Sequence, residues 1–274
     1  MDAGRLFGVR HPDLLVLTAA AVISVRAVGY RYRSAPALDD VTFDLHPGVT
    51  ALVGVNGAGK TTLLNLLATR LSPQVGSIEF DSGHELPGAS ARVLTALRTQ
   101  VSLAPQEFEV PRHLRIEDFM RYMAWARAVR RSERDPQIVD ALAAVDLSGR
   151  RRMRIGSLSG GMRRRLNIAQ ALLNEPRLIL LDEPFAGLDP EQRTGLRDRI
   201  RELDRAAAAV VISSHELQDV GLIAARVIML DAGRVVFDGT LDRLEQLGRD
   251  AVTPRSGVSP LEAAFLALRQ GVRP

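Results

Sequence analysis

The chain has 274 residues, 46% of them hydrophobic, and can bury one large core or two small ones. It contains no cysteine, which excludes disulfides and thiolate metal sites and fits a reducing cytoplasm. The formal net charge is +4, but arginines alternate with acidic residues along helical stretches and aromatic residues make up only 4%, so no specific nucleic acid is expected as a partner.

Residues 1–21 are predicted to be an N-terminal extension. The longest apolar run, LLVLTAAAVISV at 14–25, is shorter than the ~20 residues of a membrane span. Its second half is interpreted as the beginning of a strand. A signal peptide is the weaker alternative, because no small-residue cleavage site stands in a convincing place. A start codon assigned too far upstream is a third explanation.

The next segments favour two kinds of sheet. Residues 22–32, 39–45 and 76–80 alternate or are rich in β-branched residues, and they predict a small antiparallel sheet. Four further segments are predicted as strands of a parallel sheet, because three of them are continuous apolar runs, typical of strands buried on both faces. These four segments are 50–54, 100–104, 178–183 and 210–214. Residues 226–237 predict a terminal hairpin.

A helical insertion is predicted between the parallel strands at 100–104 and 178–183. Residues 107–155 show no strand pattern and contain the helix-like runs EDFMRYMAWARAVR and PQIVDALAAVDL. The tail after Thr240 is polar and then closes with SPLEAAFLALRQ. Its apolar residues fall at helical spacing and predict a short amphipathic helix: Leu261, Ala264, Phe265 and Leu268.

The stretch GVNGAGKT at 54–61 fits the phosphate-binding pattern G-x-x-x-x-G-K-[ST], between a predicted strand and a helical pattern. Glycines let backbone amides curl round an anion, and the following helix adds its positive end. Lys60 would reach the β and γ phosphates, and the Thr61 hydroxyl would bind Mg²⁺. Lys60 is also the only lysine among 36 basic residues, as expected where a guanidinium is too wide. The predicted nucleotide-binding residues here are Gly54, Val55, Asn56, Gly57, Ala58, Gly59, Lys60, Thr61 and Thr62.

Polar side chains follow three of the predicted parallel strands. Asp182 would hold the Mg²⁺ shell, and the neighbouring Glu183 could polarise the attacking water. His215 follows the strand 210–214, and Gln106 lies two residues past the strand 100–104, from where its amide could reach the metal or the water. Ligand sites in such sheets lie at the carboxyl ends of strands. For each motif taken alone, the alternative is a strand that simply ends in polar residues.

The stretch LSGGMRRRLNIAQALL at 158–173 predicts a helix. Its apolar face would consist of Met162, Leu166, Ala169 and Leu173. A Ser-Gly-Gly start exposes backbone amides at the helix N-terminus and predicts a second anion site, formed by Ser159, Gly160 and Gly161. The alternative is a glycine-rich turn with a capping serine.

In this order the motifs resemble those of the ATP-binding subunit of an ABC transporter, over residues of about 22–240. GVNGAGKT is similar to Walker A, Gln106 to the Q-loop, LSGGM to the signature, LILLDE to Walker B, AGLDP at 186–190 to the D-loop and His215 to the switch. The resemblance implies an α/β fold. It would have a P-loop NTPase core with a mainly parallel sheet, a small antiparallel β subdomain, a helical subdomain inserted at about 107–175, and a tail at 241–274.

The resemblance also implies roles for single residues. Tyr32 matches the aromatic residue that stacks on adenine, and Tyr30 is the less favoured choice. Glu183 would be the general base, His215 would contact the γ-phosphate and Asp189 would couple two sites. Each ATP would lie between Walker A of one subunit and Ser159, Gly160 and Gly161 of the other in a head-to-tail dimer. The implied metal ligands are Thr61, Gln106 and Asp182.

We therefore expect an ATPase that uses ATP and Mg²⁺ to drive a separate integral-membrane permease from the cytoplasmic face of the cell membrane. Its dimer partner would be a second copy or a paralogous ATPase subunit. The tail VSPLEAAFLAL resembles that of exporter-type ATPases of the drug or polyketide class, which favours export.

The alternative is a soluble ABC ATPase that acts on nucleic acid, the ribosome or a protein assembly. Relatives of that kind usually carry two cassettes or long coiled coils, and this sequence has neither. A third reading is an ATP-binding module without turnover. The presence of both Glu183 and His215 argues against that reading.

Overall fold

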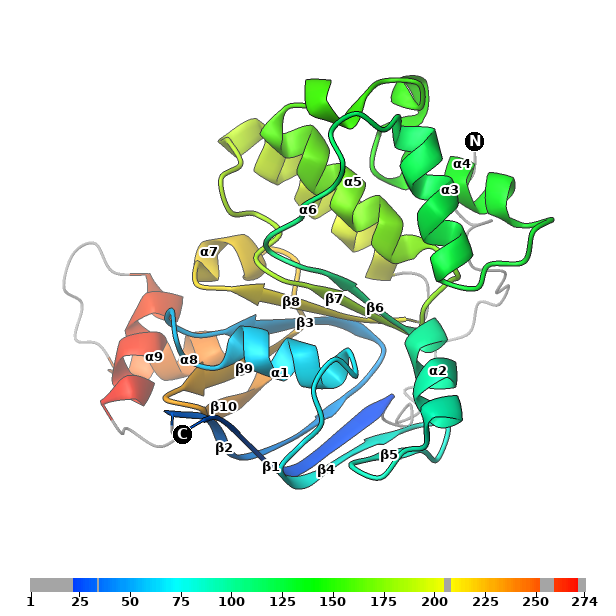
Figure 1. The fold of residues 1–274 in the computed structure, drawn as a ribbon. Coiled ribbons are helices and arrows are strands. Elements are labelled where there is room, and N and C mark those ends of the chain that lie inside the picture. The colour runs from blue at the N-terminus through cyan, green and yellow to red at the C-terminus, as the bar shows by residue number, and fades with distance from the viewer. Residues whose placement is uncertain (1–21, 34, 205–207, 252–258, 271–274) are drawn as a thin grey trace, which may run out of the picture.

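The computed structural model describes residues 22–33, 35–204, 208–251 and 259–270. The predicted N-terminal extension, residues 1–21, lies outside this part of the chain. Figure 1 shows a central sheet with helices on both faces and a second sheet beneath it.

The central sheet has six strands in the order β10-β9-β3-β8-β7-β6. Strand β3 pairs in parallel with β8 and β9, β7 pairs in parallel with β6 and β8, and only β10 is antiparallel, to β9. The strands are β3 (Gly48–Val53), β6 (Val101–Ala104), β7 (Leu178–Leu181), β8 (Ala209–Ser214), β9 (Arg226–Asp231) and β10 (Arg234–Thr240). The predicted mainly parallel sheet and its terminal hairpin are confirmed.

Apolar side chains cover both faces of this sheet, which explains the continuous apolar runs in the sequence. In β7, Leu178 and Leu180 point into one hydrophobic cluster, and Ile179 and Leu181 point into the other. All four side chains are buried. Successive residues of a strand face opposite sides, so a strand covered on both faces needs an apolar residue at every position.

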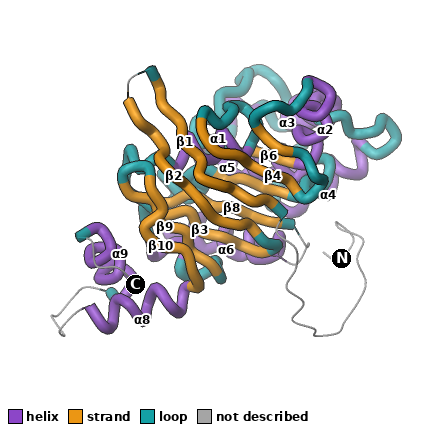
Figure 2. The backbone as a smooth tube through the Cα atoms, turned by 90° about the horizontal axis from the view of Figure 1, so that it is seen from below, coloured by secondary structure: helices purple, strands orange, loops and turns teal. Residues whose placement is uncertain are grey.

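The second sheet is antiparallel, with the order β2-β1-β4-β5. Its strands are β1 (Ile23–Tyr32), β2 (Ala35–Leu45), β4 (Val75–Phe80) and β5 (Glu85–Leu86). The three predicted strands are confirmed, and Figure 2 shows how β1, β2 and β4 lie across the central sheet. Strand β5 was not predicted, because two residues are too short to show alternation.

Helix α1 (Lys60–Leu67) packs between the two sheets (Figure 1). Its leucines share one hydrophobic cluster with Val25 and Ile78 of the antiparallel sheet and with Val211 of the central sheet. Helix α2 (Ala91–Gln100), capped by the Ser90 hydroxyl, leads directly into β6. The phosphate-loop helix is therefore held between the two sheets.

The opposite face of the central sheet is covered by α3, α4, α5 and α6 (Figure 1). These helices are α3 (Ile116–Ala126), α4 (Arg134–Ala144), α5 (Gly160–Leu172) and α6 (Pro190–Asp204). Residues 105–177, all of which the structure describes, contain helices, two 3₁₀ turns and one isolated bridge, but no strand. This is the segment for which the sequence predicts a helical insertion.

Helix α5 is buried more widely than its predicted apolar stripe. Of the predicted face, Leu166 and Ala169 are buried, Met162 is only half-buried, and Leu173 falls just beyond the helix end. The polar Asn167 and Gln170 are buried as well. They donate to backbone carbonyls of the β6 segment, at 2.7 Å to Pro105 and 3.2 Å to Leu103. The helix is enclosed between the sheet and the helices α3 and α4, so polar residues that find partners are tolerated inside.

The C-terminal part consists of α7 (Leu217–Val220), α8 (Leu241–Ala251) and α9 (Pro260–Arg269). The predicted amphipathic helix is present as α9, whose first turn carries a capping box of Ser259 and Glu262. Helix α8 was not predicted, because its sequence LDRLEQLGRDA reads as polar. No helix within the described part of the chain is both long and apolar enough to cross a bilayer.

Candidate functional site

The phosphate-binding stretch forms a tight loop between β3 and α1. Gly59 adopts a φ of +104°, and a Cβ atom there would lie 2.6 Å from the backbone oxygen of Ala37. A Cβ atom on Gly54 would lie 2.5 Å from the backbone oxygen of Leu230. Side chains at either position would collide with neighbouring backbone, so the two glycines of the motif are required by the packing around the loop.

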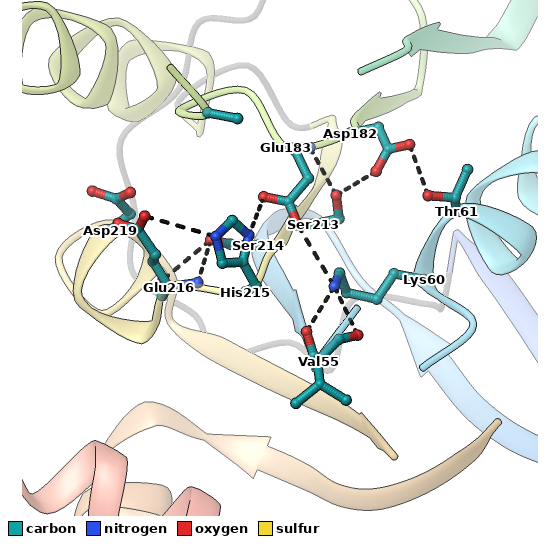
Figure 3. A network of polar contacts seen from close by, with 12 residues as sticks. Val55, Lys60, Thr61, Asp182, Glu183, Ser213, Ser214, His215, Glu216 and Asp219 are labelled. Carbon is teal, nitrogen blue, oxygen red and sulfur yellow. Dashed lines mark hydrogen bonds and ion pairs between the residues drawn. The ribbon is translucent and has the colours of Figure 1, made fainter. Parts of the chain in front are cut away.

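Lys60 is the first residue of α1, and its side chain folds back into this loop. Its Nζ donates hydrogen bonds to the backbone oxygens of Gly54 at 2.6 Å and Val55 at 3.3 Å (Figure 3). The same Nζ lies 3.6 Å from Oε1 of Glu183, and both side chains are almost fully buried. A compact ammonium satisfies these acceptors, whereas a planar guanidinium would not fit between them.

Asp182 and Thr61 meet at the carboxyl end of β7. The Thr61 hydroxyl donates to Oδ2 of Asp182 at 3.1 Å, and the hydroxyl of Ser213 donates to Oδ1 at 2.6 Å. Ser213 Oγ also accepts a hydrogen bond from the backbone N–H of Glu183 at 2.8 Å. Ser213 therefore fixes both acidic residues. It was not among the predicted site residues, although it lies two positions before His215.

Glu183 links the loop to the residue after β8. Its φ is +48°, a left-handed conformation that is rare for a residue with a side chain. In this conformation the buried carboxylate has Lys60 near one oxygen, and Nδ1 of His215 lies 2.9 Å from the other, Oε2. Asp182, by contrast, accepts from Thr61 and Ser213. The two adjacent carboxylates therefore have different partners and can have different roles.

The oxygen atoms of Thr61 and Asp182 are suited to Mg²⁺, which binds hard oxygen ligands and keeps water or phosphate oxygens in its remaining positions. Within the described ranges no group of three His, Cys, Asp or Glu side chains converges as a metal site. A magnesium ion at this site could take the carboxylate of Asp182 and the hydroxyl of Thr61 from this network, and further ligands from nucleotide and water.

The remaining predicted residues lie outside this contact network. Gln106 is exposed, and its backbone oxygen accepts a hydrogen bond from Arg164 at 2.8 Å. Tyr32 is exposed at the end of β1, with its ring against that of Tyr30. Asp189 caps α6 by accepting from the backbone N–H of Gln192 at 2.8 Å.

The Ser-Gly-Gly stretch begins α5 as predicted. The Ser159 side chain caps the helix by accepting from the backbone N–H of Met162 at 3.2 Å. Ser159 and Gly160 are exposed, whereas a Cβ atom on Gly161 would lie 2.1 Å from the side-chain oxygen of Gln192. Ser159 is thus the capping serine of the alternative reading, while Gly160 and Gly161 belong to the helix itself rather than to a turn. This arrangement is compatible with an exposed anion site at the same helix end.

Arg164 connects this helix to the site, and sequence reasoning missed it. Its guanidinium donates to the backbone oxygens of Gln106 at 2.8 Å and Ala186 at 3.2 Å. Burial lowers the pKa of Arg164, and the carboxylates of Asp182 and Glu183 act in the opposite direction. In the sequence it stands in a run of three arginines, and that run gives no sign of which side chain turns inward.

Comparison with known proteins agrees with these features. The sequence profile of the family described as "ABC transporter" matches residues 38–186. A daunorubicin resistance ATP-binding protein, DrrA3 of Streptomyces coeruleorubidus, is 34% identical over 85% of this chain and 73% of its own length. A Nod factor export ATP-binding protein I of Cupriavidus pinatubonensis is 32% identical over 90% of this chain and 78% of its own.

Two further matches are similar in kind. A sulfate/thiosulfate import ATP-binding protein, CysA 2 of Rhizobium meliloti, is 34% identical over 81% of this chain and 60% of its own length. Among solved structures, the ATP-binding subunit of an ABC transporter superposes with a TM-score of 0.76 at 28% identity, over 90% of this chain and 99% of that one.

Proposed function

This chain belongs to the ABC transporter family as an ATP-binding, ATP-hydrolysing cassette, and from that premise we propose that it dimerises head to tail around two ATP molecules and drives a separate membrane permease for export. The observation that carries the proposal is the chain of contacts from Thr61 through Asp182, Ser213 and Glu183 to His215 and Lys60 (Figure 3).

The contacts support distinct roles for these side chains. Lys60 and the loop amides would bind the β and γ phosphates, and Thr61 and Asp182 would hold Mg²⁺. The metal ion supplies positive charge that offsets the charge developing on the transferred phosphoryl group. Glu183 would accept the proton of the attacking water, and His215 would orient this carboxylate and contact the γ-phosphate. Ser213 would keep the two acids apart.

The dimer is proposed from the exposed helix end at Ser159 and Gly160. This end lies on α5, outside the contact network around Lys60. A Cβ atom on Gly160 would meet nothing within 4 Å, so the surface there is open to an approaching phosphate. Backbone N–H groups at a helix N-terminus bind anions well. A second chain that supplies its nucleotide to this end would complete both sites, with Asp189 near the junction.

The permease would dock on the helical subdomain. Helices α3 and α4 expose Tyr122, Trp125 and Val139, with exposed fractions of 59%, 60% and 42%. Large apolar side chains this exposed are common where another protein binds. A permease bound here would hold the cassette at the cytoplasmic face of the membrane. Export is favoured because the two exporter or drug-resistance relatives align over more of their own length than the importer does.

The test begins with the purified chain. It should hydrolyse ATP in the presence of Mg²⁺. It should also copurify with the protein encoded by the adjacent reading frame, if that protein carries about six apolar segments of about 20 residues, each long enough to span a membrane. Trp125 is the only tryptophan, so its fluorescence reports docking directly. A blue shift on adding that membrane protein in detergent is expected, and a Trp125→Glu variant should hydrolyse ATP normally yet fail to copurify. Copurification with ribosomes or nucleic acid instead would contradict the transport assignment.

A further inference from the structure

One guanidinium connects the turn at 186–190 with the segment that carries His215. Arg193, on the first turn of α6, donates from Nε to the backbone oxygen of Leu188 at 3.1 Å. Its Nη1 donates to Oδ2 of Asp219 at 2.9 Å and also to the carboxylate of Glu216, the residue after His215. Figure 3 shows Glu216 and Asp219 beside His215.

The contacts of Arg193 with Glu216 and Asp219 join opposite charges, and one of the two carboxylates is buried. The Asp219 side chain is 3% exposed and lies between two arginines, because Arg197 donates to its second oxygen at 2.6 Å. The hydrogen bond from Arg193 lowers the pKa of Glu216 and raises the pKa of Arg193 itself. Both groups therefore stay charged across the neutral range, and the fork of Arg193 is held by three acceptors at once.

Glu216 in turn fixes the backbone on either side of His215. The Ser214 hydroxyl accepts from the backbone N–H of Glu216 at 3.0 Å and donates to its carbonyl at 3.1 Å. Because Arg193 also holds its side chain, both the backbone and the side chain of Glu216 are restrained. His215 stands between Ser214 and Glu216, and its side chain is 44% exposed. Its Nδ1 lies 2.9 Å from Oε2 of Glu183, and its Nε2 lies 3.8 Å from Oε1 of Glu216, so the position of the imidazole depends on the flanking backbone and on how the Glu216 carboxylate is held.

We propose that Arg193 is a positioning residue that couples the turn at 186–190 to the orientation of His215 against Glu183. The inference rests on the proposed head-to-tail dimer, in which this turn lies near the partner subunit. Docking of the partner then fixes the turn through Leu188, and the turn fixes Glu216 and His215 through Arg193. The contact between His215 and Glu183 of each chain would then depend on formation of the dimer.

Arg197 provides a matched control for Arg193. Both arginines lie on α6 one turn apart, both are partly buried, and both pair with Asp219. Of these two described arginines, only Arg193 also donates hydrogen bonds to Leu188 and Glu216. Arg193→Gln and Arg197→Gln should both lower the melting temperature, since each removes one partner of a buried carboxylate, and Arg193→Gln should lower it at least as much because it also loses the contacts to Leu188 and Glu216.

Turnover should separate the two variants. With the full-length chain at saturating Mg-ATP, Arg193→Gln should lower kcat by about tenfold to a hundredfold, because misplacement of a catalytic group costs that much. Its dissociation constant for a fluorescent ATP analogue should stay within about twofold of wild type, since the binding loop is untouched. Arg197→Gln should keep kcat within about threefold of wild type. Equal kcat losses in the two variants, measured at a temperature where both are folded, would overturn the proposal.

Two further variants keep the test decisive if Arg193→Gln is poorly folded. Glu216→Gln leaves the buried pair of Arg193 and Asp219 intact, so it should fold and still lose kcat. In a double-mutant cycle it should add little to the loss in Arg193→Gln, and full additivity would contradict coupling through this contact. Arg193→Lys should restore melting temperature more than kcat, because one ammonium cannot serve three acceptors. Wild-type protein that binds but does not hydrolyse ATP would refute the proposed function instead.

Discussion

At the scale of single residues, Lys60 shows how shape and charge combine. Its ammonium lies inside the loop, within hydrogen-bonding distance of two backbone oxygens and near the carboxylate of Glu183. A phosphate that enters the loop would replace these acceptors with its own oxygens, so the position of the charge is set before nucleotide arrives. A guanidinium carries the same charge but needs a wider space.

Lys60→Arg is therefore expected to weaken ATP binding at least about a hundredfold, equivalent to about 3 kcal/mol of lost charged hydrogen bonds. Titration calorimetry with Mg-ATP measures this. Lys60→Met, which removes the charge but keeps a narrow side chain, is the reference for a pure loss of charge. Near wild-type affinity in the arginine variant would refute the steric explanation.

Glu183 has the geometry of a base that acts on water. Glu183→Gln keeps the shape of the side chain but removes its negative charge and its ability to take a proton. We expect hydrolysis to fall by about 10²–10⁴-fold while Mg-ATP binding is retained. A phosphate-release assay together with binding titration checks both parts. Asp182→Asn is the contrasting variant, because it should lose Mg²⁺-dependent binding. Residual turnover close to wild type in Glu183→Gln would place the base elsewhere.

The residue scale also shows what the sequence could predict at the site. Lys60, Thr61, Asp182, Glu183 and His215 were identifiable because they stand at fixed positions after strands or in a known loop pattern, and the structure brings all five into contact. The supporting residues were not. Ser213, Arg164 and Arg193 are common side chains whose importance arises from contacts across long separations in sequence, and no local pattern marks them.

At the scale of elements, the two C-terminal helices, α8 and α9, approach each other closely at a glycine. A Cβ atom on Gly248 of α8 would lie 1.7 Å from the backbone oxygen of Pro260, at the beginning of α9. Gly195 of α6 is also helical, but a Cβ atom there would meet nothing within 4 Å. Both glycines lower the intrinsic stability of their helix by a similar amount, but Gly248 is packed against another helix whereas Gly195 has open space beside it.

Alanine at these two positions should therefore have opposite effects on the free energy of unfolding. Gly248→Ala is expected to destabilise the protein by about 1–3 kcal/mol, because α8 and α9 must move apart. Gly195→Ala is expected to stabilise it by about 0.5–1 kcal/mol, because alanine restricts the unfolded chain more than glycine does. Urea unfolding followed by circular dichroism compares the two. A stabilised Gly248→Ala would show that the helix pair is not closely packed.

The elements of the core were predictable because their local patterns are strong, although the strands that pair lie far apart in the sequence. The strands of the parallel sheet are apolar at nearly every position, and α9 has both an apolar stripe and a capping box. Helix α8 was missed although Leu241, Leu244 and Leu247 form a short apolar stripe, because charged residues surround the stripe and only its packing against β9, β10 and α9 shows that it is buried. The burial of polar residues on α5 was missed because its Asn167 and Gln170 are satisfied by backbone atoms of a distant segment.

At the scale of the whole molecule, the site is assembled at one edge of the central sheet. The carboxyl ends of β3, β7 and β8 contribute the loop, the two acids and His215 respectively. The exposed N-terminal end of α5 lies outside the contact network around Lys60 in the described part of the chain. Backbone N–H groups at such a helix end are suited to a phosphate, and we propose that a second chain supplies it, so that each ATP is shared between two chains.

A substitution at Gly160 can test whether ATP is shared between two chains, because the described part of its own chain leaves room for a side chain there. A Cβ atom there would meet nothing within 4 Å, so Gly160→Asp should fold normally, whereas Gly161 is packed against Gln192 and is a poorer probe. Gly149→Asp, at another open glycine on the helical subdomain, is the matched control. The decisive measurement is light scattering and ATPase activity of isolated Gly160→Asp with Mg-ATP. We expect wild-type nucleotide affinity, a mass that stays near 29.9 kDa, and no turnover in Gly160→Asp, with the control variant unaffected. Full ATPase activity in isolated Gly160→Asp would contradict the shared site.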